Sequence, residues 1–292
     1  MQIHLLDATY ELFRAHFGRP SRTGIDGAPV GATTGVVESV LSLLRDDGVT
    51  HLGCATDHVI HSWRNERYTG YKTDEDMPPE LKGQFGLMEE ALRALGVVVW
   101  PMVEFEADDG LGAAAARFAD HPDVERVIIL SPDKDMAQCV REDGRVVTFN
   151  RREGRFFDAD GVDEKFGVRP ASIPDYLALV GDSADGFPGL PGWGAKSAAV
   201  VLARYPHLED IPDSINAWDL KVRGAASLAR ALQEGREDAL LFRELATLRL
   251  DAPIPEHDPE QLRWRGVDRP AFEAMAVRLR SPRLLERLPT HG

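Results

Sequence analysis

The residues best suited to chemistry in this sequence are five carboxylates that form two groups between residues 103 and 140. Glu106, Asp108 and Asp109 open an alanine-rich run, which predicts a helix. Asp133 and Asp135 follow the apolar run 127–130, whose length and composition are typical of a buried strand. Both groups therefore stand at the ends of predicted elements, where ligand sites are usually built.

Acidic side chains at a helix start have a structural explanation, because the positive end of the helix dipole favours each by about 0.3–1 kcal/mol. That explanation does not account for Asp133 and Asp135 at the end of a strand. Two carboxylates ~5 Å apart repel by roughly 3 kcal/mol at an effective dielectric near 20, so such a cluster is solvated, partly protonated or bound to a cation. All-oxygen ligands without His or Cys favour a hard ion such as Mg²⁺ or Mn²⁺.

Two further aspartates end predicted strands. Residues 1–7 form a short apolar strand that ends in Asp7, and residues 51–56 form a second strand followed by Asp57. Capping of the next helix explains Asp7 as well as metal binding does. Strands alternating with helices nevertheless predict an α/β fold with aspartates at strand ends. The other predicted elements are helices at 9–17, 30–44, 80–95, 158–166, 225–232, 239–248 and 271–279, and strands at 97–100, 146–149 and 155–157.

Two segments have the composition of nucleic-acid contacts. Between residues 62 and 84, basic side chains alternate with Tyr68 and Tyr71, which suits a phosphate backbone and stacked bases, although an ordinary surface loop can have the same composition. The run GLPGWGAKSA at 189–198 predicts a helix-hairpin-helix, because glycines allow a tight turn and the amides that open the second helix can face a phosphate. A purely structural turn is the alternative. Asp182 and Asp185 lie in a glycine-bounded turn just before this run.

The composition is that of a folded protein with an acidic surface. The 292 residues are 43% hydrophobic and 28% charged, enough for one large domain or one and a half. A net charge of −14 argues at first sight against nucleic-acid binding, because proteins that bind nucleic acid are generally basic, but lysine and arginine gather at 64–72 and 263–287. Cys54 and Cys139 have no CxxC spacing, which predicts packed, reduced thiols. Without a signal peptide or an apolar run of spanning length, we expect a cytoplasmic protein that does not bind membranes.

Together these motifs resemble the bacterial 5′-nuclease family, which includes the 5′-exonuclease domain of DNA polymerase I, phage 5′-nucleases and stand-alone flap endonucleases. The resemblance extends in collinear order over nearly the whole chain and rests on Asp7, Phe13-Arg14, Trp63-Arg64, Tyr71-Lys72, EADD at 106–109, SPDKD at 131–135 and GDSADGFPGLPGWGAKSA at 181–198.

The fold implied by this resemblance is α/β and PIN-like, with a central, mostly parallel sheet flanked by helices. A helical arch is expected around 62–84. We expect a metal-dependent nuclease core at 1–170 and a helical region at 171–292 that contains the helix-hairpin-helix at 174–205. Because the sequence stops at Gly292, a free-standing enzyme is expected.

The implied activity is a 5′-3′ exonuclease or flap endonuclease that cuts 5′-ended or branched DNA with two divalent ions, Mg²⁺ or Mn²⁺. In such a site one ion lowers the pKa of the attacking water and the other stabilises the leaving oxygen. The implied ligands of the first ion are Asp7, Asp57, Glu106, Asp108, Asp109 and Asp133, and those of the second are Asp135, Asp182 and Asp185, with Asp133 near both.

The resemblance also assigns charge balance at the scissile phosphate to Lys72 and Arg64. The implied DNA contacts are Arg14, Tyr71, Gly192, Gly194, Lys196 and Ser197. DNA is thus the expected partner of a monomeric protein, with K⁺ as a further expectation at the hairpin.

Two positions depart from the family pattern. Glu75 stands three residues after Lys72, where the family commonly has a basic residue, so an acidic arch that repels DNA is expected. Gly186 stands where the family has Asn, and a looser turn is expected there. Two alternative functions stay open: a DNA-binding protein with weak or no catalysis, and a Mg²⁺-dependent hydrolase of small phosphates, in which the hairpin would have no role.

Overall fold

The computed structural model describes residues 1–289, which form two compact units. The first unit contains residues 1–62, 73–131 and 249–289, and the second contains residues 63–72 and 132–248. Residues 290–292 of the predicted helical region lie outside the described part. Residues 249–289 belong to the first unit, although they follow the second unit in sequence. The functional division at residue 170 stays a prediction.

A parallel sheet forms the centre of the first unit. Its strands are β1 (Gln2–Asp7), β2 (His51–Asp57), β3 (Val98–Met102) and β4 (Arg126–Leu130), in the hydrogen-bonded order β3-β2-β1-β4. All three pairings are parallel, and Leu6 lies opposite both Cys54 and Leu130. The strands β1, β2 and β4 are nearly all buried, as expected for a sheet covered on both faces. The predicted α/β architecture is confirmed.

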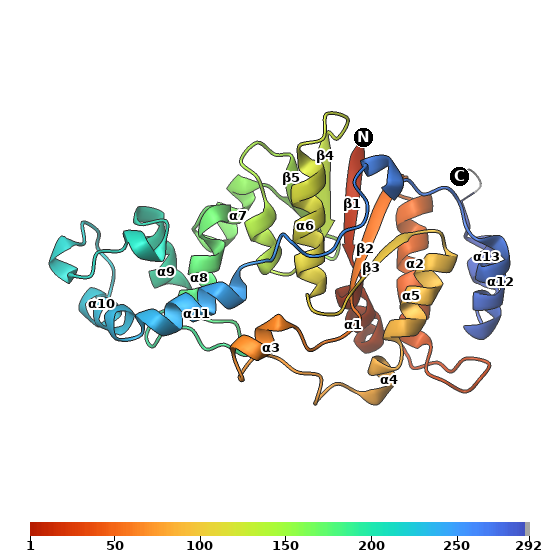
Figure 1. The fold of residues 1–292 in the computed structure, drawn as a ribbon, viewed down its shortest axis with the longest axis horizontal. Helices are drawn as coiled ribbons and strands as arrows, with labels where there is room; N and C mark the ends of the chain where they lie inside the picture. The colour runs from red at the N-terminus through yellow and green to blue at the C-terminus, as the bar shows by residue number, and fades with distance from the viewer. Residues whose placement is uncertain (290–292) are drawn as a thin grey trace. The chain divides into compact units, whose positions relative to one another are not determined.

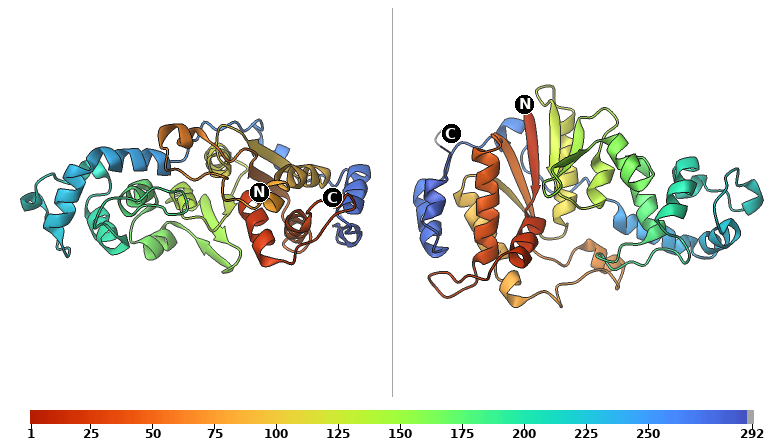
Figure 2. Two further views of the ribbon diagram at one scale, coloured as in Figure 1. Left: turned by 90° about the horizontal axis from the view of Figure 1, so that it is seen from below. Right: turned by 180° about the vertical axis from the view of Figure 1, so that it is seen from behind.

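Helices cover both faces of this sheet (Figures 1 and 2). α6 (Ala107–Ala119) packs on one face and contacts all four strands, while α1 (Ala8–Gly18) and α2 (Gly31–Arg45) cover the other. Small residues let α6 approach closely: a Cβ at Gly110 would stand 2.5 Å from Met102 Cε. The remaining helices of the unit are α4 (Pro79–Lys82), α5 (Phe85–Ala94), η5 (Pro259–Leu262), α12 (Arg269–Arg278) and α13 (Arg283–Glu286).

The single helix predicted at 80–95 is wrong, because the chain forms α4 and α5 with a break at Gly83 and Gln84. Gln84 is 2% exposed and bridges the break to other elements. Its Oε1 accepts the Thr33 N–H at 3.0 Å and its Nε2 donates to Glu80 O at 2.8 Å. These hydrogen bonds of the buried Gln84 side-chain amide stabilise the break between α4 and α5, which the helical periodicity of the sequence does not reveal.

The second unit is a β-hairpin followed by packed helices (Figure 1). β5 (Val146–Asn150) and β6 (Arg155–Phe157) pair antiparallel. The predicted helix-hairpin-helix is present as α8 (Ile173–Val180) and α9 (Ala195–Arg204), which pack together, and α8 also packs against α11 (Arg236–Ala246). The other helical segments are α3 (Trp63–Arg67), η1 (Asp135–Cys139), α7 (Ala159–Phe166), η2 (Pro170–Ser172), η3 (Leu208–Asp210), η4 (Ile215–Ala217) and α10 (Ala225–Glu234).

The core of the second unit is aromatic and aliphatic. Phe187 and Phe242 stack with ring centroids 5.7 Å apart, and Leu177 and Trp193 belong to the same buried cluster. Of the helices within residues 1–289, none is both long enough and apolar enough to cross a membrane.

Candidate metal and DNA sites

The carboxyl edge of the parallel sheet brings together acidic residues of the first unit. Asp7 ends β1 and Asp57 ends β2, and the strand register sets Asp7 opposite Ala55. Asp57 Oδ1 accepts the Ala107 N–H at 2.6 Å, so this carboxylate lies at the start of α6, where Glu106 is the N-cap residue. Three predicted ligands thus gather at one edge of the sheet.

Hydroxyl groups orient two of these carboxylates. Ser131 Oγ donates to Asp7 Oδ2 at 2.9 Å, and Ser62 Oγ donates to Glu106 Oε1 at 2.7 Å. Asp7 Oδ1 accepts the Tyr10 N–H at 2.8 Å, so the capping role left open by the sequence is confirmed. Asp7 and Glu106 are 5% and 4% exposed, and buried carboxylates held in fixed positions are suited to binding a cation.

Asp109 positions its neighbours through the backbone. This fully buried side chain accepts the Glu106 N–H at its Oδ2 (3.0 Å) and the Arg249 N–H at its Oδ1 (2.9 Å). The first bond satisfies the N-cap amide of α6, which has no partner within the helix, and the second ties the start of α6 to the backbone at Arg249. Asp108 lies partly exposed in the first turn of the same helix.

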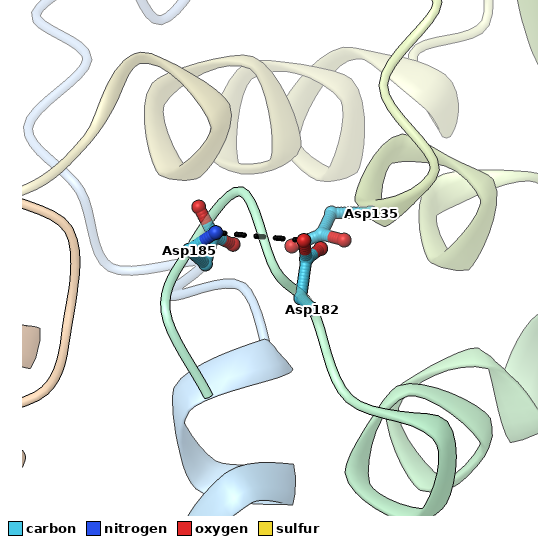
Figure 3. Close-up of side chains that lie close together, drawn as sticks. All are labelled: Asp135, Asp182 and Asp185. Carbon is cyan, nitrogen blue, oxygen red and sulfur yellow. Dashed lines mark hydrogen bonds between the residues drawn. The ribbon is translucent and has the colours of Figure 1, made fainter. Parts of the chain in front are cut away.

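A second acidic cluster lies within the second unit and consists of Asp135, Asp182 and Asp185 (Figure 3). Each contributes an oxygen within 4.8 Å of the others. Asp135 opens η1, and the other two lie in the loop after α8, where the Asp185 N–H donates to Asp182 Oδ1 at 3.4 Å. All three are buried. The structure therefore groups the three residues predicted to hold the second ion.

Two lysines partly neutralise this cluster. Lys134 Nζ lies 2.7 Å from Asp182 Oδ2, and Lys72 Nζ lies 2.8 Å from Asp185 Oδ1. Burial opposes the charge on Lys134, but the hydrogen bond to Asp182 and the surrounding carboxylates outweigh burial and raise its pKa. Asp133 adds a fourth carboxylate, whose Oδ1 accepts the Asp135 N–H at 3.0 Å. Four carboxylates face two ammonium groups, which leaves an excess of two negative charges when all are ionised.

The environment of Asp135 fits a divalent cation. Burial, followed by the neighbouring charges of Asp133, Asp185 and Asp182, raises the pKa of Asp135 well above its usual value. Its buried Oδ1 has no hydrogen-bond partner within residues 1–289. A hard cation bound to these oxygens would satisfy that atom and remove the mutual repulsion.

The turn that carries Asp182 and Asp185 is tight, so the looser turn expected from Gly186 is not what the structure shows. Gly186 has φ +90°, and a Cβ there would stand 2.2 Å from Gly70 O. The Gly186 N–H donates to Asp182 O, and the Lys72 N–H donates to Asp185 O at 2.8 Å. Glycine is required here by both its backbone conformation and the close approach of residues 70–72.

The hairpin presents a lysine at the start of α9. Gly192 has φ +80°, and Gly194 is the N-cap residue of α9. Ser197 Oγ accepts the Gly194 N–H at 3.0 Å and donates to Gly194 O at 2.9 Å, which closes the cap. Lys196 is exposed in this first helical turn. Hydrogen bonds thus hold the backbone at the start of α9, where the predicted DNA contacts lie.

Three other side chains predicted to act on DNA are engaged by groups of the protein itself. Tyr71 is 3% exposed and belongs to the core of the second unit, so its ring is not available to stack on a base. Arg64 is 2% exposed, and its Nε donates to Leu245 O at 2.7 Å, at the end of α11. Arg14 pairs with Glu11 at 2.5 Å. Glu75 is exposed, and its effect on DNA stays a prediction.

Family models match almost the whole described chain. A model described as 5′-3′ exonuclease, N-terminal resolvase-like domain, matches residues 2–167, and one described as 5′-3′ exonuclease, C-terminal SAM fold, matches residues 168–270. The chain belongs to the 5′-3′ exonuclease family. The resemblance identified from the sequence motifs is confirmed.

This member of the 5′-3′ exonuclease family spans about a quarter of the length of one relative and most of the length of another. DNA polymerase I of Pseudomonas aeruginosa is 36% identical over 261 residues, which cover 86% of this chain but 27% of the polymerase. The 5′-3′ exonuclease of Aquifex aeolicus is 32% identical over 257 residues, which cover 88% of this chain and 85% of that protein.

A solved structure shares the fold. The flap endonuclease of bacteriophage T5, in a pseudo-enzyme-product complex with DNA and metal ions, superposes with a TM-score of 0.67 at 17% identity. The match covers 96% of this chain and 100% of the T5 chain. The predicted 5′-nuclease fold is thereby confirmed.

Sequence reasoning missed three residues of these candidate sites. Lys134 stands between Asp133 and Asp135 in the sequence, and this position could have suggested a counter-ion. Ser131 follows β4 directly, as Asp7 and Asp57 end their own strands. No sequence signal singles out Ser62, since its partner Glu106 is 44 residues away.

Proposed function

We propose that this chain is a metal-dependent 5′-3′ exonuclease or flap endonuclease that hydrolyses phosphodiester bonds of 5′-ended or branched DNA. The observation that carries the proposal is the buried cluster of Asp135, Asp182 and Asp185 in a chain of this family. The name of the Aquifex relative and the DNA and metal ions bound to the T5 protein support the same activity.

Mg²⁺ or Mn²⁺ fits the two groups of carboxylates, because every candidate ligand atom is an oxygen. Asp135, Asp182 and Asp185 would hold one ion. Asp7, Asp57, Glu106 and Asp108 would hold another. Of the other two predicted ligands, Asp133 stays a prediction, and Asp109 fixes the backbone by accepting the Glu106 N–H. Bound ions would lower the pKa of a water and stabilise a leaving oxygen.

Lys72 is proposed to change partners during the reaction cycle. Its Nζ pairs with Asp185, and its backbone N–H donates to Asp185 O. Once the charge of Asp185 is neutralised, the ammonium group is available to a phosphate oxygen of the DNA. Lys134 would stay with Asp182 and hold the loop in place.

The hairpin between α8 and α9 is proposed to hold duplex DNA through its backbone phosphates. Gly192, Gly194 and exposed Lys196 lie at the start of α9, where amides and a positive charge favour an anion. Phosphate contacts at this position would not read sequence. K⁺ binding at the hairpin and a monomeric state belong to the same proposal.

Cleavage of flap, nicked and single-stranded DNA, with and without Mn²⁺, tests the activity. Asp133→Ala should abolish cutting, since this carboxylate contributes to the negative potential at Asp135 and fixes its amide. Asp163→Ala removes an exposed carboxylate from the same unit and is the matched control. Undiminished cutting by Asp133→Ala would end the assignment, and binding of DNA without any cutting by the parent would favour a DNA-binding protein.

A further inference from the structure

A cavity of about 320 Å³ in the first unit has no role in the proposed function. It lies where the C-terminal end of α12 meets the start of α13 and the loop before α2. Its charged lining consists of four arginines and one glutamate: Arg22, Arg280, Arg283, Arg287 and Glu38. This volume is at the lower end of the range for ligand pockets, about 300–1,000 Å³, which suits a small group.

The charge of this cavity differs from that of the protein as a whole. The chain carries a net charge of −14, yet four cationic side chains here face one carboxylate. Glu38 is already paired with Arg19, and Arg287 Nη1 lies 3.9 Å from it. Arg280 and Arg283 are exposed, and within residues 1–289 their side chains make no ion pair or hydrogen bond. Four arginines of the cavity lining therefore stand against one lining carboxylate, and outside the lining Arg287 also interacts with the charge of Asp46.

Arg22 is fixed in place by its neighbours. Its Nη2 donates to Arg280 O at 3.2 Å and to Ser281 Oγ at 3.0 Å. Ser281 is 7% exposed, and its own Oγ donates to Leu279 O at 3.2 Å. A guanidinium has five N–H donors in a planar fork, so Arg22 keeps donors for an anion after these bonds.

Arg280 adopts a conformation that usually requires glycine. Its φ is +48°, and among residues 1–289 it is the non-glycine residue with positive φ. The Arg280 N–H donates to Val277 O and the Ser281 N–H donates to Ala276 O, the two bonds of a Schellman motif in which glycine is the preferred residue. Arginine at this position has a backbone cost that glycine would not have, and a function of its side chain would offset that cost.

We propose that the arginine cavity is a binding site for a phosphate group. Guanidinium groups bind phosphate oxygens in pairs of parallel hydrogen bonds, and all four cations of the cavity are arginines. The phosphate comes either from the backbone of bound DNA or from a small phosphorylated anion. The DNA source rests on the proposed function, whereas phosphate binding itself does not.

The test compares Arg280→Gly and Arg283→Gln with the parent. Arg280→Gly suits a positive φ, so this variant should melt no lower than the parent while losing the guanidinium. Arg269→Gln removes the same charge from α12 outside the cavity lining and is the matched control. Binding of 5′-flap DNA is measured without divalent ions over a range of salt, and the stabilising effect of inorganic phosphate is measured by thermal unfolding.

If DNA supplies the phosphate, both cavity variants should bind DNA roughly tenfold more weakly at low salt. The slope of log affinity against log salt should also become shallower by about one unit, with no change in Arg269→Gln. Unchanged DNA binding with lost stabilisation by phosphate would identify a small anion as the ligand. Unchanged values in both measurements would overturn the proposal. A parent that cuts no DNA would refute the proposed activity and leave both measurements intact.

Discussion

Replacing Asp135 by asparagine removes one charge from the acidic cluster and keeps the side-chain shape. The oxygens of Asp182 and Asp185 lie within 4.8 Å of an Asp135 oxygen. At that distance two charges repel by roughly 3.5 kcal/mol at an effective dielectric of 20, so the two pairs together give about 7 kcal/mol when all three groups are ionised. Nearby Lys72 and Lys134 reduce this repulsion, and the raised pKa of Asp135 favours its neutral form.

We therefore expect Asp135→Asn to raise the free energy of unfolding by about 1–3 kcal/mol when metal is absent. The order should reverse with Mg²⁺ or Mn²⁺. A ligand that binds only the folded state at 100 times its Kd adds about 2.7 kcal/mol to the parent, and Asp135→Asn should gain much less. Urea unfolding in EDTA and in excess metal measures both quantities, with Asp163→Asn as the exposed control in the same unit.

Two results would refute this reasoning. If Asp135→Asn is less stable than the parent in EDTA, repulsion among the carboxylates does not destabilise the folded state. Asp135 would then stabilise that state as a hydrogen-bond acceptor. If the variant gains as much stability from metal as the parent, Asp135 is not a ligand. A gain in EDTA with a lost metal response is the expected result.

Three further predictions concern other parts of the molecule. Lys196→Ala should weaken DNA binding equally across sequences and lower the salt slope by about one unit; a sequence-selective loss in a binding assay would contradict phosphate contact. Gly186→Asn should cost roughly 1–3 kcal/mol in urea unfolding, because its Cβ would stand 2.2 Å from Gly70 O, and unchanged stability would contradict the close approach. Burial lowers the pKa of His4 to about 4, so between this value and 6.5 the unfolded chain binds more protons than the folded one. Stability should therefore rise with pH across that window by about 1–3 kcal/mol, and a pH series of urea unfolding should show a flatter profile for His4→Leu.

The elements at the carboxyl edge of the sheet could be predicted because their signals are local. The apolar runs that end in Asp7 and Asp57 are the observed β1 and β2, and the alanine-rich run after Glu106 is α6. Burial of a strand or of a helix face leaves a periodic pattern within about ten residues of sequence. Parallel pairing then brings the strand ends to one edge without further information.

The partners of the functional side chains could not be predicted in this way. Lys72 and Asp185 are 113 residues apart, and Arg64 and Leu245 are 181 residues apart. Basic residues interleaved with tyrosines favour nucleic-acid contact, yet Tyr71 is part of the core and Arg64 binds the end of α11. The composition of a segment gives the side chains that are present. The fold determines whether a basic side chain binds a carbonyl group, a carboxylate or solvent.

Gly186 shows how a single position can be misread for the same reason. Because the family pattern has asparagine at this position, glycine predicts a looser turn. In the structure, Gly70 O occupies the space that any Cβ at residue 186 would need. The same contact fixes residues 70–72 beside Asp185, so the backbone of Lys72 is bonded to the loop whose charge its side chain neutralises. A substitution at Gly70 or Gly186 would therefore displace both Lys72 and Asp185. Through this contact, we expect the stability of the loop and metal binding to change together.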